Sequence, residues 1–471
     1  MNLKKILTPL LLIVCLQGLF AQTLLSTQSL ELKKPRDSQE ILAAPEANNR
    51  GLTVFAADKN TVTALHYTRA LFYKDSLVAP RPDSDYEFMA GYSYTPDGSP
   101  QVYWASADYT KIQAVRYNFD DKTTADYFFE IPFKDEHLLT TFSNNNAFYM
   151  VTRIEKEDKL KFYEFTNDKY EAHTVDFSGY KFTDEDNVPT NFRRLLQDYP
   201  LQKIDSTAFN TMPNAVAKIK MYTAGSNILL TLDHNTGYTQ LFTISTDTYA
   251  VTEKQVKQVV INDALTNSFY HSQRLYQLVL NEEQVSLSAT DVATGEVIQQ
   301  YKAGANDTIT FKNSPLREQS GNKRPNEFKN TKRFLRRAAS GDAAIAVYQT
   351  PNDLMVISGV LRNTVSAENV MLGIAVGGMM VAGGYAGDMS GLFDSENTES
   401  VYFESLFDQD FKHKPLPQQR LAADYLAQFI NTHENMSLQT VFRFNYYFVL
   451  GYYDAKEKHF VLRKFEDDFV H

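Results

Sequence analysis

Short apolar and aromatic runs alternate along the chain with turns rich in Asp, Asn and Gly. The runs begin near Leu52 and leave little room for long helices between them. Some of them, such as Asn227–Leu232 and Leu275–Leu280, are continuously apolar, as expected for strands covered on both faces. Short strands with regular turn signals are typical of an all-β domain. The pattern therefore predicts a fold made almost entirely of strands.

The runs also follow a repeated plan, in which two strands joined by a polar turn precede an Asp or Asn turn and a third strand. The four clearest copies begin near residues 101, 147, 227 and 274. Two of the intervals are about 46 residues, and the longer interval between them contains an insertion. Weaker copies lie at 52–78, 343–360 and 440–466. A period of roughly 40–50 residues with three or four strands is the signature of propeller blades.

A small sheet with two apolar faces cannot bury both of them alone, whereas stacking several sheets around an axis covers every face. We therefore predict an all-β protein, a β-propeller of about seven blades with short helical insertions. The C-terminal strands Arg443–Leu450 and His459–Phe465 are predicted to share a blade with an N-terminal strand. A two-domain β protein divided near residues 305–340 is the alternative.

One turn carries a family resemblance. Tyr94-Thr95-Pro96-Asp97-Gly98 precedes the apolar strand Val102-Tyr103-Trp104. This arrangement resembles the aromatic-x-Pro-Asp-Gly turn and the following strand of bacterial TolB-type propeller repeats. The resemblance covers the 11 residues from Tyr94 to Trp104 and implies a tight turn between two strands of one blade. It supports the architecture and implies no particular activity.

The first 21 residues are typical of a secretory signal. Lys4 and Lys5 precede the apolar stretch Ile6–Phe20, and Ala21 is a small residue at the expected cleavage position. The one cysteine, Cys15, lies within this segment, so the mature chain has no thiol for a disulfide. Secreted eukaryotic domains usually contain disulfides, so we expect a bacterial protein exported to the periplasm, the outer surface or the medium.

The expected domain organisation follows from these features. A signal peptide at 1–21 is followed by a polar leader at 22–50, which donates one strand near Ile41–Ala44, and by the propeller at 51–471. Two insertions have helical character, Asn191–Tyr199 and Pro417–Ile430, the latter with the apolar spacing of an amphipathic helix. Insertions into the propeller are expected near 180–212, 305–340, 366–395 and 412–432.

The charge and the sequence motifs limit the function classes that the chain can belong to. The chain has 47 Lys and Arg against 57 Asp and Glu, a formal charge of −10, and loss of Lys4 and Lys5 with the signal makes it −12. An acidic chain lacks the footprint of a nucleic-acid binder, so we expect no nucleic-acid partner. The nine histidines form no HxH or HExxH motif, and no nucleophile motif is present, so no catalytic residue and no cofactor are assigned. Asp83, Asp85 and Glu87 are the weak candidates for a metal site, because alternating carboxylates are ligands that Ca²⁺ prefers.

A basic segment stands out from the acidic background. Residues 312–337 carry nine Lys and Arg against two Glu. One interpretation is a contact site for an anionic partner, and the other is a solvated insertion loop. The candidate contact residues are Lys329, Lys332, Arg333, Arg336 and Arg337.

A second segment, Val370–Ala386, is uncharged and rich in glycine. Glycine contributes little apolar surface and is costly to order, so the segment is a poor choice for core packing. We expect Leu372–Gly387 to form an apolar loop that contacts a partner or the periphery of a membrane. The candidate contact residues are Met371, Leu372, Met379, Met380 and Tyr385.

Three function classes remain open from the sequence. The first is an exported non-enzymatic binding or scaffolding protein with a protein or glycan partner in the cell envelope. The second is a carbohydrate-active hydrolase that uses carboxylates at the propeller channel. The third is a membrane-associated component of an envelope complex. A cluster of Asp and Glu with raised pKa values at the channel mouth would favour the hydrolase.

Overall fold

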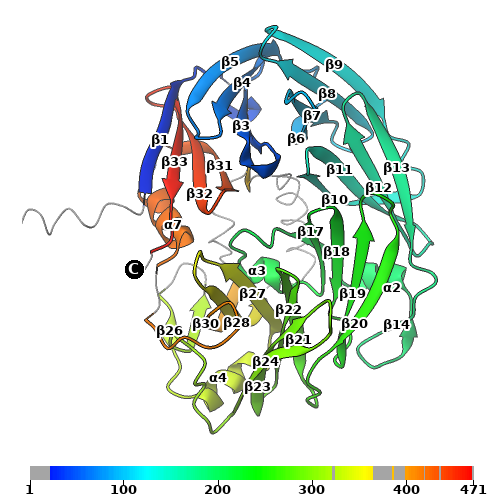
Figure 1. The fold of residues 1–471 in the computed structure, drawn as a ribbon, viewed down its shortest axis with the longest axis vertical. Coiled ribbons are helices and arrows are strands. Elements are labelled where there is room, and N and C mark those ends of the chain that lie inside the picture. Colours follow the sequence, from blue (N-terminus) through cyan, green and yellow to red (C-terminus); the bar gives the residue numbers. More distant parts are fainter. Residues whose placement is uncertain are drawn as a thin grey trace, which may run out of the picture. The chain divides into compact units, whose positions relative to one another are not determined.

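The computed structural model describes residues 22–34, 36–320, 324–363, 385–386, 398–417, 420–433 and 436–468. Within them, seven sheets of four or five strands and one two-stranded hairpin account for nearly all regular structure (Figure 1). Almost all strand pairs are antiparallel between chain neighbours, as in propeller blades. The predicted all-β fold is confirmed, and the chain is a β-propeller.

The chain forms two compact units. Unit 1 comprises the described residues up to Arg81, the pair Tyr385–Ala386, and the residues from Arg420 onward. Unit 2 comprises the remaining residues from Pro82 to Pro417. The division falls at Arg81 and in the C-terminal region, while residues 305–340 lie wholly within unit 2.

Unit 1 contains two sheets and one helix. The first sheet follows chain order, and the second combines strands from three parts of the chain. The first is β2 (Glu40–Pro45), β3 (Gly51–Ala57), β4 (Thr61–Thr68) and β5 (Tyr73–Pro80). The second is β29 (Tyr385–Ala386), β31 (Met436–Phe444), β32 (Tyr447–Asp454), β33 (His459–Phe465) and β1 (Gln22–Ser29), with helix α7 (Ala422–Thr432) packed against it.

Strand β1 completes the second sheet of unit 1. It runs antiparallel to β33, with Gln22 opposite Phe465 and Ser29 opposite His459. The prediction that the C-terminal strands share a sheet with an N-terminal strand is therefore confirmed. Two short 3-10 turns, η1 (Arg36–Ser38) and η2 (Ala47–Asn49), flank β2, which matches the strand expected near Ile41–Ala44.

The segment expected as a polar leader is part of the folded unit. Leu30 and Leu32 are buried in the same cluster as β2 and β3. The carboxylate of Asp58 accepts a hydrogen bond from the backbone N–H of Lys33 at 3.0 Å. Arg81 donates to the carbonyl of Ser38 at 2.6 Å. The sheets therefore begin upstream of residue 51, because two leucines and a few backbone contacts suffice to fix a polar segment.

Unit 2 contains five sheets of this kind, which lie side by side in chain order (Figure 1). The first two are β6 (Phe88–Tyr94), β7 (Pro100–Ala105), β8 (Lys111–Asn118) and β9 (Thr123–Glu130), and β10 (Glu136–Asn144), β11 (Ala147–Ile154), β12 (Lys159–Thr166) and β13 (Lys169–Asp176). The next two are β16 (Leu201–Ile204), β17 (Ile219–Ala224), β18 (Asn227–Leu232), β19 (Tyr238–Ser245) and β20 (Val251–Lys257), and β21 (Leu265–His271), β22 (Arg274–Leu280), β23 (Gln284–Asp291) and β24 (Val297–Gly304). The last is β26 (Asn326–Glu327), β25 (Arg317–Ser320), β30 (Thr398–Phe407), β28 (Leu354–Asn363) and β27 (Asp342–Gln349).

Insertions in unit 2 carry the remaining elements. A hairpin of β14 (Phe182–Thr183) and β15 (Pro189–Thr190) precedes helix α2 (Phe192–Asp198), whose cap Asn191 accepts from the N–H of Arg194. Helices α3 (Met212–Ala215) and α4 (Thr331–Ala338) follow β16 and β26. Both helices expected from the sequence are found, α2 and α7, and α7 begins five residues after Pro417.

The burial pattern explains the repeated plan. Every residue of the middle strand β7 is buried, whereas the outer strand β9 is mostly exposed. In some sheets the first strand mixes apolar with polar residues, as in β21 with Thr266, Asn267 and Ser268. That mixture hid these strands in the repeated plan, although β2 was expected near Ile41–Ala44.

The TolB-like turn joins β6 to β7. The N–H of Gly98 donates to the carbonyl of Thr95 at 2.9 Å, and Gly98 has a φ of 84°. A positive φ is the left-handed conformation that glycine adopts without steric cost. The Pro-Asp-Gly sequence thus forms the tight turn between strands that its turn chemistry predicts.

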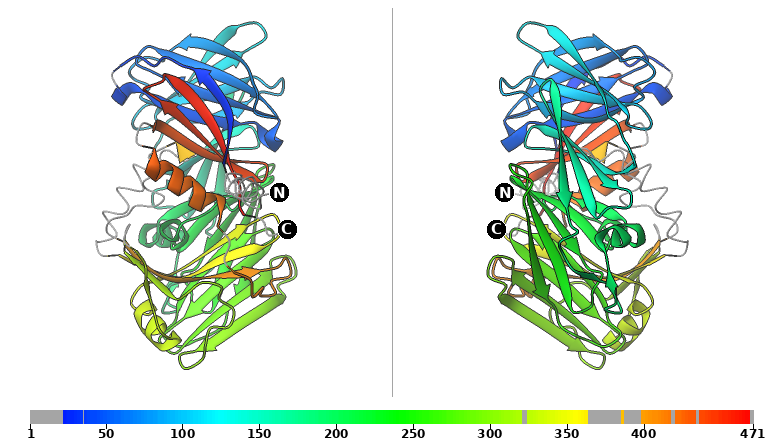
Figure 2. Two further views of the ribbon diagram at one scale, coloured as in Figure 1. Left: turned by 90° about the vertical axis from the view of Figure 1, so that its left-hand side faces the viewer. Right: turned by 90° about the vertical axis from the view of Figure 1, so that its right-hand side faces the viewer.

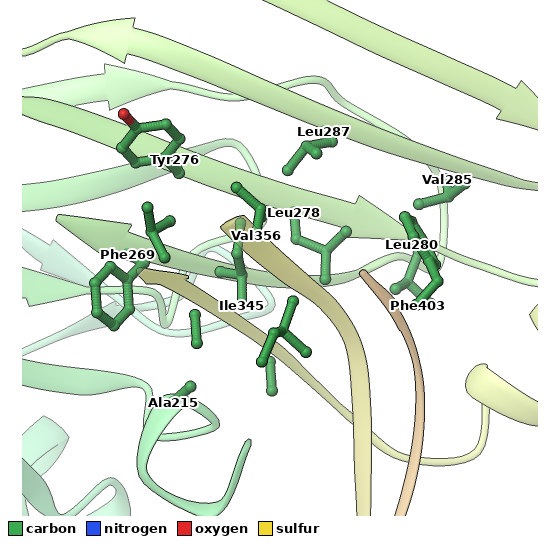
Figure 3. Close-up of a cluster of buried hydrophobic side chains, with 14 of the residues drawn as sticks. Ala215, Phe269, Tyr276, Leu278, Leu280, Val285, Leu287, Ile345, Val356 and Phe403 are labelled. Atoms are coloured by element: carbon green, nitrogen blue, oxygen red, sulfur yellow. The ribbon is translucent and has the colours of Figure 1, made fainter. Parts of the chain in front are cut away.

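The largest apolar cluster fills the space between the last two sheets of unit 2. Leu278 and Leu280 of β22 face Ile345 of β27 and Val356 of β28, and Ala215 of α3 lies beside them (Figure 3). All five side chains are buried. This cluster sets the spacing between the β22 and β27 sheets, and it also anchors the insertion that carries α3.

A substitution tests how closely the paired strands β28 and β30 approach each other within the last sheet. A Cβ atom at Gly359 would lie 2.1 Å from the carbonyl oxygen of Val401 and 2.7 Å from the Cα of Tyr402, so backbone must move to accommodate it. We expect Gly359→Ala to lower the free energy of unfolding by about 1–3 kcal/mol in a urea titration. Gly179 has nothing within 4 Å of the corresponding position, so Gly179→Ala is the matched control, with a change below about 0.5 kcal/mol. Equal effects in the two variants would contradict the packing described here.

Candidate functional site

The basic segment folds as a capped helix. Asn330 at the N-cap of α4 accepts a hydrogen bond from the N–H of Arg333 at 3.0 Å, which is the contact that favours Asn at this position. Phe334, Leu335 and Ala338 are buried on one side of the helix. The ring of Phe334 lies 5.7 Å from that of Phe403 on β30. Apolar contacts on one side therefore fix α4 at the periphery of unit 2 (Figure 2).

Arg337 is neutralised inside the fold. Its guanidinium pairs with Glu318 on β25 and, at 2.7 Å, with Glu399 on β30, and Arg362 of β28 pairs with the other oxygen of Glu399. Burial acts to raise the pKa of Glu399, but its hydrogen bonds with Glu318 and Arg337 and the nearby positive charges outweigh that effect and lower the pKa. Arg337 thus ties α4 to the sheet, and of the five basic residues expected at a contact site it is the one already engaged.

The other four form what we call the α4 basic face: Lys329, Lys332, Arg333 and Arg336. All four are exposed. Within the part of the chain that the structure describes, no carboxylate lies within ion-pair distance of any of them. Lys332 and Arg333 are one helical turn from Arg336, with Cβ atoms about 5–6 Å apart. The structure therefore gathers these residues into one compact cationic surface on an acidic protein.

A buried ionic network lies between the β17 and β21 strands. The side chains of Lys220 on β17 and Asp233, just after β18, have no exposed surface, and their charged atoms are 3.4 Å apart. Lys220 also donates to the amide oxygen of Asn267 at 2.8 Å. Asp233 accepts from the backbone N–H and the hydroxyl of Ser268, both at 2.9 Å, and from Thr239 at 2.8 Å. Each charge is thus offset by a counter-charge and by several hydrogen bonds.

Burial sets the protonation of this network. It lowers the pKa of Lys220 to about 8, while the negative charge of Asp233 opposes the shift. The neighbouring Lys218 donates to the carbonyl of Thr266 at 2.7 Å, and burial lowers its pKa as well. Lysines with depressed pKa values often mark active sites, but Lys220 has no surface at which a substrate can arrive. The chemistry that this arrangement supports is a structural ion pair between two sheets.

His234 adjoins the network without joining it. Its side chain is buried, and neither ring nitrogen has a hydrogen-bond partner among the described residues. Burial lowers its pKa to about 4, with the charge of Asp233 opposing the shift. His234 is therefore neutral near pH 7. Sequence reasoning missed Lys220, Asp233 and His234, although a lysine within the apolar run Ile219–Tyr222 was a visible signal.

An insertion covers the inner edges of three sheets of unit 2. Strand β16 pairs in parallel with β17, an unusual addition to an otherwise antiparallel sheet. Beyond it, the ring of His271 on β21 is 2.8 Å from the carbonyl of Ser206, and the ring of Phe209 lies 5.9 Å from that of Tyr348 on β27. Residues 201–215 therefore bridge strands β17, β21 and β27, where the hydrolase hypothesis needed accessible carboxylates.

Glu46 is a carboxylate with a raised pKa, caused by burial and opposed by the charge of Arg50 at 3.1 Å. Asp83, Asp85 and Glu87 are exposed, and Asp85 pairs with Lys111 at 2.7 Å. No group of three or more His, Asp, Glu or Cys side chains suited to a metal ion occurs in the described ranges.

The apolar loop falls largely outside the described residues, with Met371, Leu372, Met379 and Met380 among those not described. Tyr385 and Ala386 are described as strand β29, which pairs with β31 through Tyr385 opposite Val441. In the ranges that the structure covers, no helix has the length and hydropathy needed to cross a membrane.

Comparisons with known proteins add only distant likenesses. No family model matches the chain, and no curated protein matches it. Solved structures that align with it include one from a structural and mechanistic analysis of two prolyl endopeptidases, with 9% identity and a TM-score of 0.35 over 92% of this chain and 51% of that chain. They also include the WD40 domain of SCAP from fission yeast, with 8% identity and a TM-score of 0.31 over 94% of this chain and 98% of that chain. A third is the dihydro-heme d1 dehydrogenase NirN, with 10% identity and a TM-score of 0.31 over 93% of this chain and 69% of that chain. The chain spans about half the length of the prolyl endopeptidase. At these scores the likenesses carry no functional argument, and the fold assignment rests on the sheets themselves.

A double-mutant cycle tests the buried pair. Removing one partner of a buried ion pair leaves an uncompensated charge, so we expect Lys220→Met to lower the free energy of unfolding by about 3–5 kcal/mol. The double variant Lys220→Met/Asp233→Asn should lose less than the sum of the single losses, because it leaves no isolated charge. Chemical denaturation of the four proteins measures the coupling, and additivity within about 0.5 kcal/mol would contradict the pairing.

His234 predicts a pH dependence of stability. Its pKa is about 4 in the folded protein, against about 6.5 in the unfolded chain. Between these values the unfolded chain binds a proton that the native protein does not, so stability is lost as the pH falls from 6.5 to 4. We expect the wild type to lose on the order of 3 kcal/mol more than His234→Gln over this window. His459→Gln, at a partly exposed strand position, is the control and should retain the wild-type profile. Parallel profiles for the wild type and His234→Gln would show that this histidine is not held neutral.

Proposed function

We propose that this protein is an exported, non-enzymatic binding or scaffolding protein that contacts an anionic partner through the α4 basic face. The observation that carries the proposal is the set of four exposed cations that have no counter-charge among the described residues. They lie on a protein whose overall formal charge is negative. A surface that concentrates one sign of charge attracts a partner of the other sign.

The way α4 is held supports binding over a loosely solvated loop. Phe334 and Leu335 anchor one side, and Arg337 is fixed between Glu318 and Glu399. The exposed cations are therefore presented on a rigid support. Pre-organisation of this kind reduces the entropy lost when a partner binds.

Export is proposed from the sequence, in which Lys4 and Lys5 precede an apolar stretch and Ala21 is a small residue at the expected cleavage position. Cleavage after Ala21 would keep the residues of β1 that pair with β33. The partner is accordingly sought in the cell envelope, where the protein acts alone or as one component of a complex.

A carbohydrate-active hydrolase is the competing function class, and a glycan screen distinguishes it from a non-enzymatic binding protein. We expect the purified chain 22–471 to release no reducing ends from a panel of bacterial and plant glycans, because residues 201–215 cover the strand edges where the hydrolase would need accessible carboxylates. Turnover of any glycan in the panel would overturn the non-enzymatic assignment.

The contact itself is tested by charge reversal. We expect Arg333→Glu/Arg336→Glu to lose partners that the wild type retains from an envelope extract at low salt, while the melting temperature falls by only about a few degrees. Lys59→Glu/Lys74→Glu, two exposed cations in unit 1, makes the same change in net charge and should retain them. If both variants retained the partners equally, α4 would not be the contact site.

A further inference from the structure

The exposed side of α4 consists of positively charged side chains. Lys332, Arg333 and Arg336 are its exposed residues, whereas the apolar residues Phe334 and Leu335 are buried against the sheet. No large hydrophobic side chain of α4 itself is exposed. A ligand that lies along the exposed side of α4 therefore meets ammonium and guanidinium groups.

This composition separates the classes of anionic partner. Protein interfaces place aromatic and apolar side chains at the centre of the contact, where most of the binding energy arises. A helix that binds a membrane surface inserts an apolar face below the headgroups. The α4 basic face has neither feature. A heavily hydrated polyanion, which is bound through charge and hydrogen bonds alone, needs neither.

The arrangement of the cations favours a repeating ligand over a single small anion. Arg333 and Arg336 are one turn apart, as are Lys332 and Arg336, and a helix of the eight residues of α4 spans about 12 Å. Each guanidinium presents a planar fork that matches a carboxylate or a sulfate. A chain that carries such groups at regular intervals engages several cations at once, whereas an isolated anion engages one.

From these observations we infer that the ligand of the α4 basic face is a linear acidic polysaccharide that carries carboxylate or sulfate groups. This inference rests on the proposed function, because it names the partner of the same surface. The polysaccharide lies along α4 and contacts Lys329, Lys332, Arg333 and Arg336. Arg337 takes no part in the contact, since its guanidinium stays with Glu318 and Glu399.

Direct binding to defined polymers tests the inference. Chain 22–471 is titrated with heparin as a sulfated chain, polygalacturonate as a carboxylated chain and dextran as the neutral control. Two further probes are poly-L-glutamate and vesicles that contain phosphatidylglycerol. We expect binding to at least one of the two acidic polysaccharides, no binding to dextran, and weaker or no binding to the other probes.

Variants connect the binding to α4. Arg333→Glu/Arg336→Glu should weaken binding by about tenfold or more and reduce its dependence on salt concentration, since two charged contacts are lost. Lys332→Gln/Arg333→Gln, which adds no negative charge, should weaken it less and guards against a folding defect in the first variant. Lys59→Glu/Lys74→Glu should bind as the wild type does.

The outcomes separate the inference from the proposed function. Binding to poly-L-glutamate or to vesicles that is tighter than to either acidic polysaccharide, and is lost in Arg333→Glu/Arg336→Glu, would overturn the polysaccharide and leave an anionic contact at α4. Polysaccharide binding that the α4 variants do not change would overturn the assignment to this face. Failure to bind any of the probes would overturn both.

Discussion

The need to cover two apolar faces of each small sheet governs this structure. The middle strands β18 and β22 are buried at all but one position each. A strand of this kind is stable only when another sheet lies on either side of it. Stacking of sheets follows from that requirement, and so does the division of labour along each sheet, in which outer strands face water and carry the charged residues. The cluster around Leu278 and Ile345 shows the result, since apolar side chains from the facing surfaces of two sheets and from a short helix pack against one another (Figure 3).

Charged groups enter this interior only where the fold supplies every partner. Asp233 reaches Lys220, Ser268 and Thr239 from a loop between two strands, so its charge is offset across two neighbouring sheets. Glu399 serves the same purpose at the edge of unit 2, where it holds Arg337 and Arg362 together. Both carboxylates fix the position of one element against another. The two networks differ in what they leave exposed. The Asp233 network has no exposed surface, while the Glu399 network supports helix α4, whose outer side is entirely cationic.

Much of the fold was predictable because its signal is local. Strands β18 and β19 match the apolar runs Asn227–Leu232 and Tyr238–Ser245, and the turn at Gly98 follows from its residues. Strands such as β17 and β21 were not predicted, because Lys220 and Asn267 interrupt their apolar pattern while pairing with each other across two sheets. The basic segment was recognised as a candidate contact site, but its helix was not, since only the tertiary contacts of Phe334 and Arg337 show which side is buried. Long-range pairing, such as that of β25 with β30, leaves no mark on the local sequence.

The pairing of β1 with β33 has a consequence for how the chain folds. Gln22 lies opposite Phe465, so β1 can pair only after β33, near the other end of the described chain, has been synthesised. Contacts between residues so far apart in the chain form slowly, because the loop between them must close first. Until then β33 is an open edge, and open edges of this kind pair readily with other chains. Closure of this sheet therefore cannot begin before the polypeptide is almost complete.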